Sequence, residues 1–545
     1  MAESILFRVC SGFSTQLGFA IFAVCASFLL LRMIRQKSQL SSIPAVGIAK
    51  TREDRRKEFL SGKARNLYIE GYRKFKDGAF RIMTARGNCD AFNQLCSRLT
   101  LVPESECIVV SPNFLRQLKK LPDTVLSFNE AVEEALQTRY TKISSNIPTI
   151  PHTLKTSLNP ALFRLNPVIL DEVTTGIRDE FPQSSEWTTV SINKKLMRVV
   201  AKTSGRIFVG PGLCRDEVYL EAAVGYTFDM TAAIQAVGFI SPWLRPIMAS
   251  RLPQVKKLHT RFQQADAFLR PIVTARREAA KSRLAGEAKP DDMLQWLLDS
   301  QDKFGQQSDR EISKYQLSLT FAAIHTTTVA LTHSFYNLVA MPELVQILRD
   351  EIVEAVADTK GEITATAIQR MLKLDSFIKE IMRFYPQTAT AFQRKVMKTF
   401  TLPNGQLVPA GTIIEVPSHA INYDETIYAE PEKFDALRFY NIRKQKEAAL
   451  SMTMSANDAT TEAAANNQFT SVSETSLAFG YGRNACPGRF FAANEIKMIL
   501  ATTILNYDLK MPDGCTARYD NLTVGSQLVP DPSKSIMMKL RNREG

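Results

Sequence analysis

The feature that most constrains the fold of this chain is a glycine-rich loop with a single cysteine, which leads directly into an apolar segment. The loop spans residues 479–488 and reads FGYGRNACPG. Its glycines permit positive φ or a close approach of the backbone to a flat ligand, and Pro487 suits the first turn of a helix. The run from Arg489 to Leu500 is typical of that helix. Cys486 therefore lies just before a predicted helix N-terminus, where unpaired N–H groups and the helix dipole favour a thiolate.

The loop by itself leaves two interpretations of Cys486 open. A lone Cys-Pro-Gly is most often a buried cysteine in a tight turn, whereas a thiolate held before a helix is also a good axial ligand for haem iron. The spacing favours the second interpretation. Phe479, Gly482, Cys486 and Gly488 form the pattern Phe-x-x-Gly-x-x-x-Cys-x-Gly, which resembles the haem-binding signature of the cytochrome P450 family.

This resemblance implies that the cofactor is haem b and that the Cys486 thiolate is the axial ligand of its iron, with the other residues of the pattern around the haem. One position departs from the family. Asn484 stands two residues before the cysteine, where the family usually has Arg or His to reach a haem propionate. The neighbouring Arg483 is the expected substitute. Arg394, on a strand-like stretch, is a second candidate for a propionate partner.

The net charge of the chain bears on its partners. In 545 residues there are 68 Lys and Arg against 55 Asp and Glu, which gives a formal charge of +13. The basic residues are dispersed and no nucleic-acid motif accompanies them, so nucleic-acid binding is not expected. An anionic membrane surface and an acidic protein partner fit better. The eight cysteines form no CxxC pair, which favours a reduced compartment over a disulfide scaffold.

An apolar run from Gly12 to Leu31 has the length of one membrane-spanning helix. A cleavable signal peptide is the alternative, but the segment before the run carries little positive charge. Arg32, Arg35 and Lys37 follow the run and read as a positive cytoplasmic flank. We therefore expect a single-pass protein of the endoplasmic reticulum membrane whose catalytic domain faces the cytosol. Its expected parts are a short segment at 1–11, an anchor at 12–31, a basic flank and hinge at 32–49 and the catalytic domain at 50–545.

The catalytic domain is expected to be mainly α with a minor β portion, as in the cytochrome P450 fold. A charged helix is expected at about 50–75, with short strands at Phe80 to Met83 and Cys107 to Val110. Residues 444–476, rich in Ala, Asn, Thr and Ser, predict a largely flexible insertion. From about 114 to 348 the pattern is helical, with breaks expected at Pro148, Pro151, Pro160, Pro167 and Pro242.

The apolar helix predicted from Leu317 to Ala340 contains the run AAIHTT at 322–327. Ala322 and Thr326 are four residues apart and share one face, where small side chains would let the helix pass close to a flat cofactor. The run resembles the helix that crosses the distal haem face in the family, and Thr326 matches its oxygen-binding threonine. His325 stands where an acid is usual. A hydrogen-bonded core histidine and a proton relay are both open for it, and the relay is our hypothesis because no other ionisable group lies nearby on the helix.

A second helix contains Glu380 and Arg383, whose spacing of three allows an ion pair that is usually worth a few tenths of a kcal/mol. About fifty residues later comes PEKFDALRF, at 431–439, which looks like the Pro-x-x-Phe and Arg-Phe element of the family. The resemblance implies that Glu380, Arg383 and Arg438 form a buried structural triad, with two guanidinium groups on one carboxylate. Such a triad shapes the cysteine loop without touching substrate.

The order of these motifs spans nearly the whole chain and resembles fungal P450 enzymes that oxidise terpenoid scaffolds in secondary metabolism. It implies a monooxygenase that uses O2 on a lipophilic small molecule. No NADPH or flavin fingerprint is apparent, so electrons are expected from NADPH–cytochrome P450 reductase, with cytochrome b5 as a further donor. The pocket walls are expected in 222–252 and in the loops after Arg383. Two alternatives stay open, namely a haem-thiolate isomerase or dehydratase that works without reductase, and a non-enzymatic haem-binding sensor.

Overall fold

The computed structural model describes residues 24, 27, 40–47, 52–84, 106–240, 244–282 and 288–542 of the chain. The expected anchor at 12–31 lies outside the described residues except for Val24 and Ser27, and so does most of the basic flank. Pro242, where a helix break was expected, is also outside them. Within the described residues, no helix has both the length and the apolar character that crossing a membrane requires.

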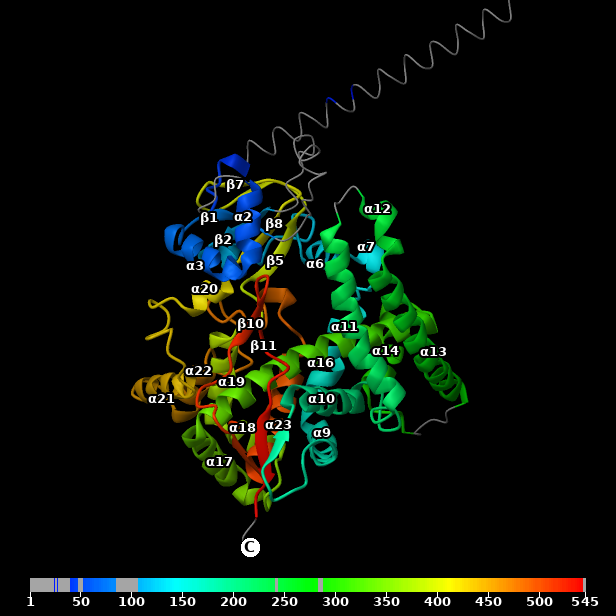
Figure 1. Ribbon diagram of the computed structural model, residues 1–545, viewed down its shortest axis with the longest axis vertical. Helices are drawn as coiled ribbons and strands as arrows, with labels where there is room; N and C mark the ends of the chain where they lie inside the picture. Colours follow the sequence, from blue (N-terminus) through cyan, green and yellow to red (C-terminus); the bar gives the residue numbers. More distant parts are fainter. Residues whose placement is uncertain are drawn as a thin grey trace, which may run out of the picture.

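The described chain is mainly helical, with short strands gathered at one end and along one side (Figure 1). The helices of nine or more residues are α3 (Ala64–Lys74), α6 (Phe128–Leu136), α9 (Asn159–Glu180), α10 (Ile192–Phe208), α11 (Glu217–Phe239), α13 (Pro253–Ser282), α16 (Asp309–Ala340), α17 (Pro342–Val356), α19 (Leu372–Phe384), α21 (Arg438–Leu450), α22 (Ala456–Ala464) and α23 (Arg489–Asn506). The shorter ones are α2 (Arg52–Glu58), α5 (Leu115–Leu118), α7 (Thr138–Thr141), α8 (Thr149–Thr153), α12 (Arg245–Met248), α14 (Met293–Asp299), α15 (Gln301–Phe304), α18 (Ala365–Arg370) and α20 (Ser418–Asn422).

The strands of the described residues form one mixed five-stranded sheet, one three-stranded sheet and two two-stranded sheets. The larger sheet has the order β1-β2-β8-β5-β3, in which β2 and β8 run parallel and pair Cys107 with Ile413. The two strands expected near residues 80 and 107 are confirmed as β1 and β2. The strands are β1 (Ala79–Met83), β2 (Glu106–Val110), β3 (Leu126–Ser127), β4 (Thr188–Val190), β5 (Ala391–Val396), β6 (Phe400–Thr401), β7 (Leu407–Val408), β8 (Ile413–Val416), β9 (Tyr507–Lys510), β10 (Asn521–Val524), β11 (Gln527–Pro530) and β12 (Ile536–Leu540).

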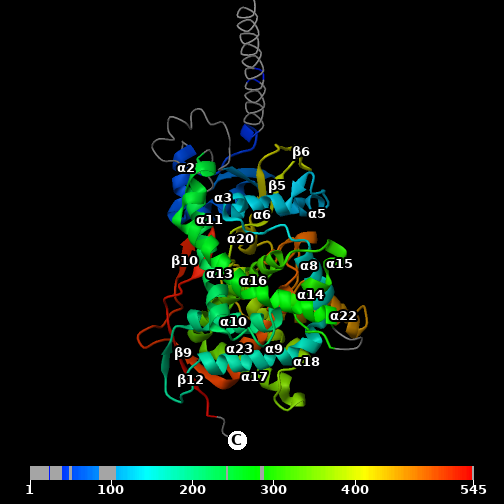
Figure 2. The ribbon, with the colours of Figure 1, turned by 90° about the vertical axis from the view of Figure 1, so that its right-hand side faces the viewer.

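Helix α16 runs through the middle of the molecule, above α23 in the view of Figure 2. It begins with a capping box, in which Ser308 and Glu311 satisfy each other's backbone N–H groups. Its second half is buried on all sides, and Phe335 and Tyr336 have no exposed surface. Two buried polar side chains there are hydrogen-bonded, since the hydroxyls of Thr332 and Ser334 donate to carbonyls one turn back along the helix. The expected helices at 317–340 and 489–500 are confirmed as parts of α16 and α23.

Three of the expected helix breaks are wrong. Pro151 lies within α8, and Pro160 and Pro167 lie within the 22 residues of α9. Pro160 follows a π-helical turn, η3 (Leu154–Leu158), in which the N–H of Asn159 donates to the carbonyl of Leu154, so the helix continues past it. Pro167 is inside the helix and costs it one backbone hydrogen bond, but burial of Leu165 and Ile169 against the core holds the helix together. Tertiary packing thus overrides the local signal.

The segment 444–476 differs from the flexible insertion that its composition predicts. It contains the end of α21 and the whole of α22, and Ala459 and Ala463 are fully buried. Two side chains of α19 hold its far end. The Lys379 ammonium donates to the carbonyls of residues 466 and 468, each at 2.8 Å, and the Asp375 carboxylate accepts the N–H of Phe469. These contacts join residues about ninety positions apart, so composition alone does not reveal them.

One buried acid lies in the helical core. Glu495 of α23 is 1% exposed, and its Oε1 accepts a hydrogen bond of 2.9 Å from the Ser204 hydroxyl of α10. Its Oε2 has no partner among the described residues. Burial raises the pKa of Glu495 to about 8, so the carboxyl is protonated in the folded protein at neutral pH.

The free energy of unfolding is therefore expected to fall as pH rises between about 4.5 and 8, with a slope of up to about 1.4 kcal/mol per pH unit from this group. The folded state keeps the proton in this window while the unfolded chain releases it. The stabilisation is complete below the unfolded pKa and lost once pH passes the folded pKa. Thermal melting of the wild type and Glu495→Gln from pH 5 to 9 checks this. Parallel pH profiles for the two proteins would contradict it.

Candidate active site

The cysteine loop is held by its own backbone. The N–H of Cys486 donates to the carbonyl of Phe479 at 2.8 Å, which closes the turn. Gly480 and Gly482 have φ of +74° and +72°, a region that favours glycine, and a Cβ on Gly482 would come within 3.1 Å of Lys119. Gly488, the N-cap of α23, has a φ of −85°, so the positive φ that its residue type permits is not used there.

Cys486 is half-buried, directly before the first turn of α23. Burial raises the pKa of its thiol, while the backbone N–H groups of Gly488 and Arg489 and the charge of Arg489 act in the opposite direction. The stabilising groups expected at a helix N-terminus are thus present, but desolvation of the sulfur outweighs them. A metal cation bound to the sulfur would favour the thiolate.

A cavity of about 800 Å³ separates the cysteine loop from α16. Cys486 and Gly488 line one wall, and Ala322 and Thr326 line another. The remaining walls are largely apolar and include Leu136, Ile150, Leu154, Phe208, Tyr226, Met230, Phe321, Met382 and Phe491. Sequence analysis expected the region 222–252 and the loops after Arg383 to contribute, and Tyr226, Met230 and Gln387 do so.

Thr326 opens onto the cavity. Its hydroxyl donates to the carbonyl of Ala322 at 2.8 Å, one turn back along α16. The side-chain amide of Gln387 donates to the carbonyl of Thr326 at 2.9 Å. Gln387 follows α19 and lies 61 residues away, so only the fold brings it to the distal helix. No motif in the sequence predicts this hydrogen bond between Gln387 and Thr326.

The position of His325 does not support the proton relay that the sequence suggested. The residue is absent from the cavity lining, because one step along a helix turns a side chain by about 100°. Its ring packs edge-to-face on Phe228 of α11, with centroids 5.3 Å apart, and its Nε2 has no partner among the described residues. Burial lowers the pKa of His325 to about 4. The imidazole is therefore neutral near pH 7 and a poor proton donor.

Three basic side chains lie at or near the cavity. Arg483 lines it but binds the Asp123 carboxylate at 2.6 Å. Arg394 is 5% exposed and donates to the Asn484 side chain at 3.2 Å, and burial with the charge of Arg483 lowers its pKa to about 10. Lys155 also lines the cavity, and its ammonium has no hydrogen bond or ion pair among the described residues. Sequence reasoning missed Lys155 because it belongs to no motif.

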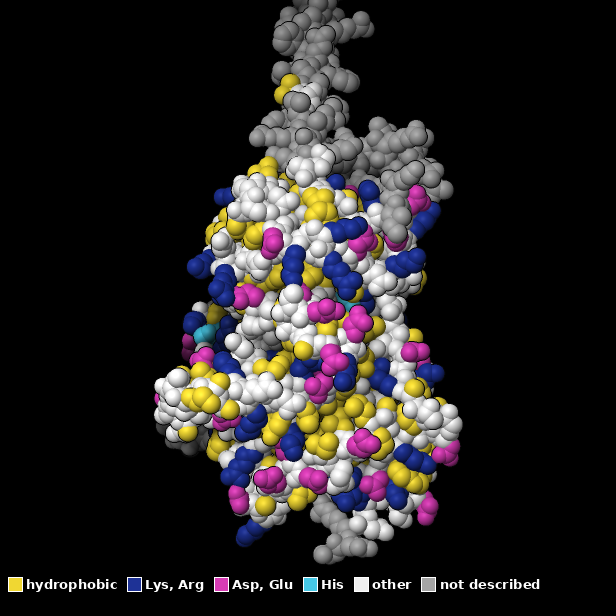
Figure 3. All heavy atoms as spheres, turned by 90° about the vertical axis from the view of Figure 1, so that its left-hand side faces the viewer, with side chains coloured by type: hydrophobic (Ala, Val, Ile, Leu, Met, Phe, Trp, Pro, Cys, Tyr) yellow, Lys and Arg dark blue, Asp and Glu magenta, His cyan; other side chains and the backbone are white. Residues whose placement is uncertain are grey.

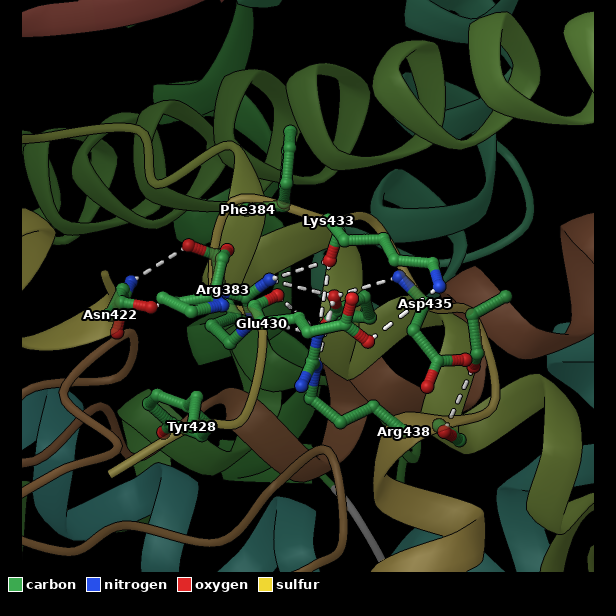
Figure 4. Close-up of polar contacts among 12 residues, drawn as sticks. Arg383, Phe384, Asn422, Tyr428, Glu430, Lys433, Asp435 and Arg438 are labelled. Atoms are coloured by element: carbon green, nitrogen blue, oxygen red, sulfur yellow. Dashed lines mark hydrogen bonds and ion pairs between the residues drawn. The ribbon is translucent and has the colours of Figure 1, made fainter. Parts of the chain in front are cut away.

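The expected triad is present in the structure, and Figure 4 labels two of its members, Arg383 and Arg438. Glu380 has no exposed surface, and its two carboxylate oxygens bind Arg383 at 2.8 Å and Arg438 at 3.2 Å. The N–H of Asp435 adds a third contact at 3.1 Å. None of the three triad residues lines the cavity. The triad thus joins α19 to the segment before α21, away from the space where a substrate would lie.

The residues around the cavity fit a haem group. A Cβ added to Gly488 would meet no atom within 4 Å, so this wall leaves room for a flat ring next to the thiol. Ala322 of α16 also lines the cavity, and its small side chain lets a flat ring lie close to that helix. Arg483 and Lys155 supply cations for two carboxylates, while the thiol of Cys486 is a suitable fifth ligand for iron.

Comparisons with known proteins agree with this site. The model of the family described as Cytochrome P450 matches residues 153–537. The chain is 36% identical over 449 residues to the cytochrome P450 monooxygenase ATR3 of Stachybotrys chlorohalonatus. The aligned region covers 82% of this chain and 91% of that protein. It is 32% identical to the cytochrome P450 monooxygenase AtmP of Aspergillus flavus and 31% identical to paxP of Penicillium paxilli, each over 89% of this chain and 87% of the relative.

Proposed function

Because this chain belongs to the cytochrome P450 family and is a monooxygenase, we propose that it oxidises a lipophilic, terpenoid-type intermediate of secondary metabolism. The electrons come from NADPH through a separate cytochrome P450 reductase. One observation carries the proposal. Cys486 of the glycine-rich loop and Thr326 of α16 line the same largely apolar cavity, so a haem held by the cysteine would share this space with a lipophilic substrate.

When bound, the haem supplies activation of O2 for insertion of one oxygen atom into the substrate. The residues of this chain bind and position. Cys486 would hold the haem iron, and the N–H groups of Gly488 and Arg489 donate hydrogen bonds that stabilise negative charge on its sulfur. Lys155 and Arg483 would hold the haem carboxylates, and Arg394 positions the Asn484 side chain of the cysteine loop. Thr326 holds a hydroxyl proton at the distal wall, within an environment from which apolar side chains exclude water.

The substrate class is supported by the chemistry of the walls. Leucine, isoleucine, phenylalanine and methionine side chains surround the cavity, so binding is driven chiefly by burial of apolar surface. The polar groups among them include Thr326, Gln387 and Tyr226, which are uncharged at neutral pH. A lipophilic scaffold with few polar atoms suits such a lining better than an ionic substrate.

The partners and location follow from charge and from the N-terminal sequence. A net charge of +13 suits an acidic reductase, with cytochrome b5 as a further donor, and an anionic lipid surface. On the face shown in Figure 3, basic and acidic side chains are interspersed, without a continuous basic stripe that would fit nucleic acid. The apolar run at 12–31 supports an anchor in the endoplasmic reticulum membrane, with the catalytic domain in the cytosol, where Asn521 of β10 stays free of glycan.

The proposal is tested by comparing metabolites of two hosts. Both express the reductase, one with this chain and the other with Cys486→Ala. A product that carries one more oxygen atom and requires NADPH supports the proposal. Conversion that continues without reductase would instead favour an isomerase or dehydratase.

With that substrate in hand, Thr326→Ala is expected to lower the ratio of product formed to NADPH consumed severalfold. The electrons from NADPH that do not yield product are expected to reduce O2 to hydrogen peroxide, because the variant lacks the hydroxyl proton of Thr326. His325→Phe is the matched control on the next residue of α16, and its ratio should equal that of the wild type, since its ring lies outside the cavity lining. An unchanged ratio in Thr326→Ala, or a fall in His325→Phe as large as in Thr326→Ala, would contradict these roles.

A further inference from the structure

Tyr226 is a buried tyrosine whose hydroxyl group has no hydrogen-bond partner among the described residues. It lies in the middle of α11, is 6% exposed and lines the cavity together with Met230, one helical turn further on. Burial is the single cause of the altered acidity of its phenol. Tyr226 thus belongs both to the main core and to the cavity lining.

Three other polar side chains of the same cavity bond to protein groups. The hydroxyls of Ser318 and Thr326 donate to α16 carbonyls one turn back, at 3.0 and 2.8 Å. The amide of Gln387 donates to the carbonyl of Thr326. Tyr219, two turns before Tyr226 on α11, is equally buried but does not line the cavity, and its hydroxyl lies 3.5 Å from that of Thr320. Tyr226 differs from all of these.

A hydroxyl that lines an apolar cavity loses its contact with water when a ligand fills the cavity. A donor or acceptor left without a partner in this way costs binding free energy relative to one that is paired. Burial raises the pKa of Tyr226 to about 12, so the phenol stays neutral and can both donate and accept a hydrogen bond. A pure hydrocarbon in the cavity would leave this cost in place, whereas a ligand with one suitably placed oxygen atom would remove it.

We propose that Tyr226 is a specificity-determining residue that binds an oxygen atom already present on the substrate, a hydroxyl or carbonyl group. The inference rests on the proposed function and narrows its substrate to an oxygenated scaffold. The reaction that supplies this substrate must then introduce an oxygen atom or retain one during assembly of the scaffold. The phenol fixes one end of the molecule, and the geometry of α11 against α16 determines which carbon reaches the haem.

The test uses ligands that bind haem iron through an imidazole nitrogen, because such ligands need no knowledge of the natural substrate. The probes are 1-alkylimidazoles from hexyl to dodecyl and the corresponding imidazoles with a terminal hydroxyl group. Kd is measured from the shift of the Soret band for the wild type, Tyr226→Phe and the control Tyr219→Phe. The preference for the hydroxylated member of each pair in the wild type, divided by that in the variant, gives the coupling between the two hydroxyl groups.

For Tyr226→Phe we expect a coupling of about three- to tenfold at one or more chain lengths, the size of a neutral hydrogen bond. For Tyr219→Phe we expect a factor near one at every length. A general loss of packing would weaken both members of a pair equally and leave the factor unchanged. A coupling factor near one for Tyr226→Phe at all chain lengths overturns the role of Tyr226 and leaves the proposed function unaffected. If no imidazole shifts the Soret band of the wild type, the haem-thiolate site itself fails, and the inference with it.

Discussion

Arg383→Ala is expected to prevent the accumulation of folded, haem-loaded protein. The substitution leaves the Glu380 carboxylate, which has no exposed surface, without its closest cation at 2.8 Å. Breaking a buried ion pair by removing one partner costs ~3–5 kcal/mol. Arg438, at 3.2 Å, stays on the carboxylate but compensates only part of its buried charge. That is a large part of the ~5–15 kcal/mol by which a typical domain is stable.

Arg383 also holds backbone that the carboxylate does not reach. Its guanidinium donates to the carbonyls of Asn422, the last residue of α20, and Pro431, which precedes α21, at 2.6 and 2.9 Å. Figure 4 labels Arg383 and Asn422. The substitution therefore releases the segment between these helices as well as the charge. Because this segment leads through α21 and α22 into the cysteine loop, loss of haem should accompany loss of stability.

The measurement is thermal melting together with the yield of haem per protein. Lys281→Ala is a matched control, because Lys281 and Glu278 form an ion pair with the same spacing of three but are 72% and 63% exposed. This variant should melt within a few degrees of the wild type, as exposed pairs contribute ~0–1 kcal/mol. Equal stability of Arg383→Ala and Lys281→Ala would refute the structural role of the triad.

The parts of the site that could be predicted from the sequence depend on short spacings. The loop around Cys486, the helix that presents Thr326 and the Glu380–Arg383 pair each need residues within about ten positions of one another. Turn chemistry, helical periodicity and a cap act over such distances. The partner Arg438 was reached only through resemblance to the family, since no local rule joins it to Glu380.

What could not be predicted depends on contacts between distant elements. His325 faces Phe228 of α11 because of the way that two helices cross, and its exclusion from the cavity follows from that packing. Pro167 is tolerated inside α9 because the helix is enclosed by the core. The regions of Gln387 and Tyr226 were expected at the cavity, but no motif shows which of their side chains reach it. Residues such as these decide which substrate fits, whereas the motif residues decide the chemistry.

The central claim is that Cys486 is the ligand of a haem iron, and the spectrum of the reduced protein with carbon monoxide tests it most directly. The wild type and the control Cys515→Ala, in which an exposed cysteine outside the cavity lining is removed, should both show the red-shifted Soret band of a thiolate ligand. In Cys486→Ala that band should be absent, even where some haem is retained. Persistence of the red-shifted band in Cys486→Ala would contradict the assignment of the site.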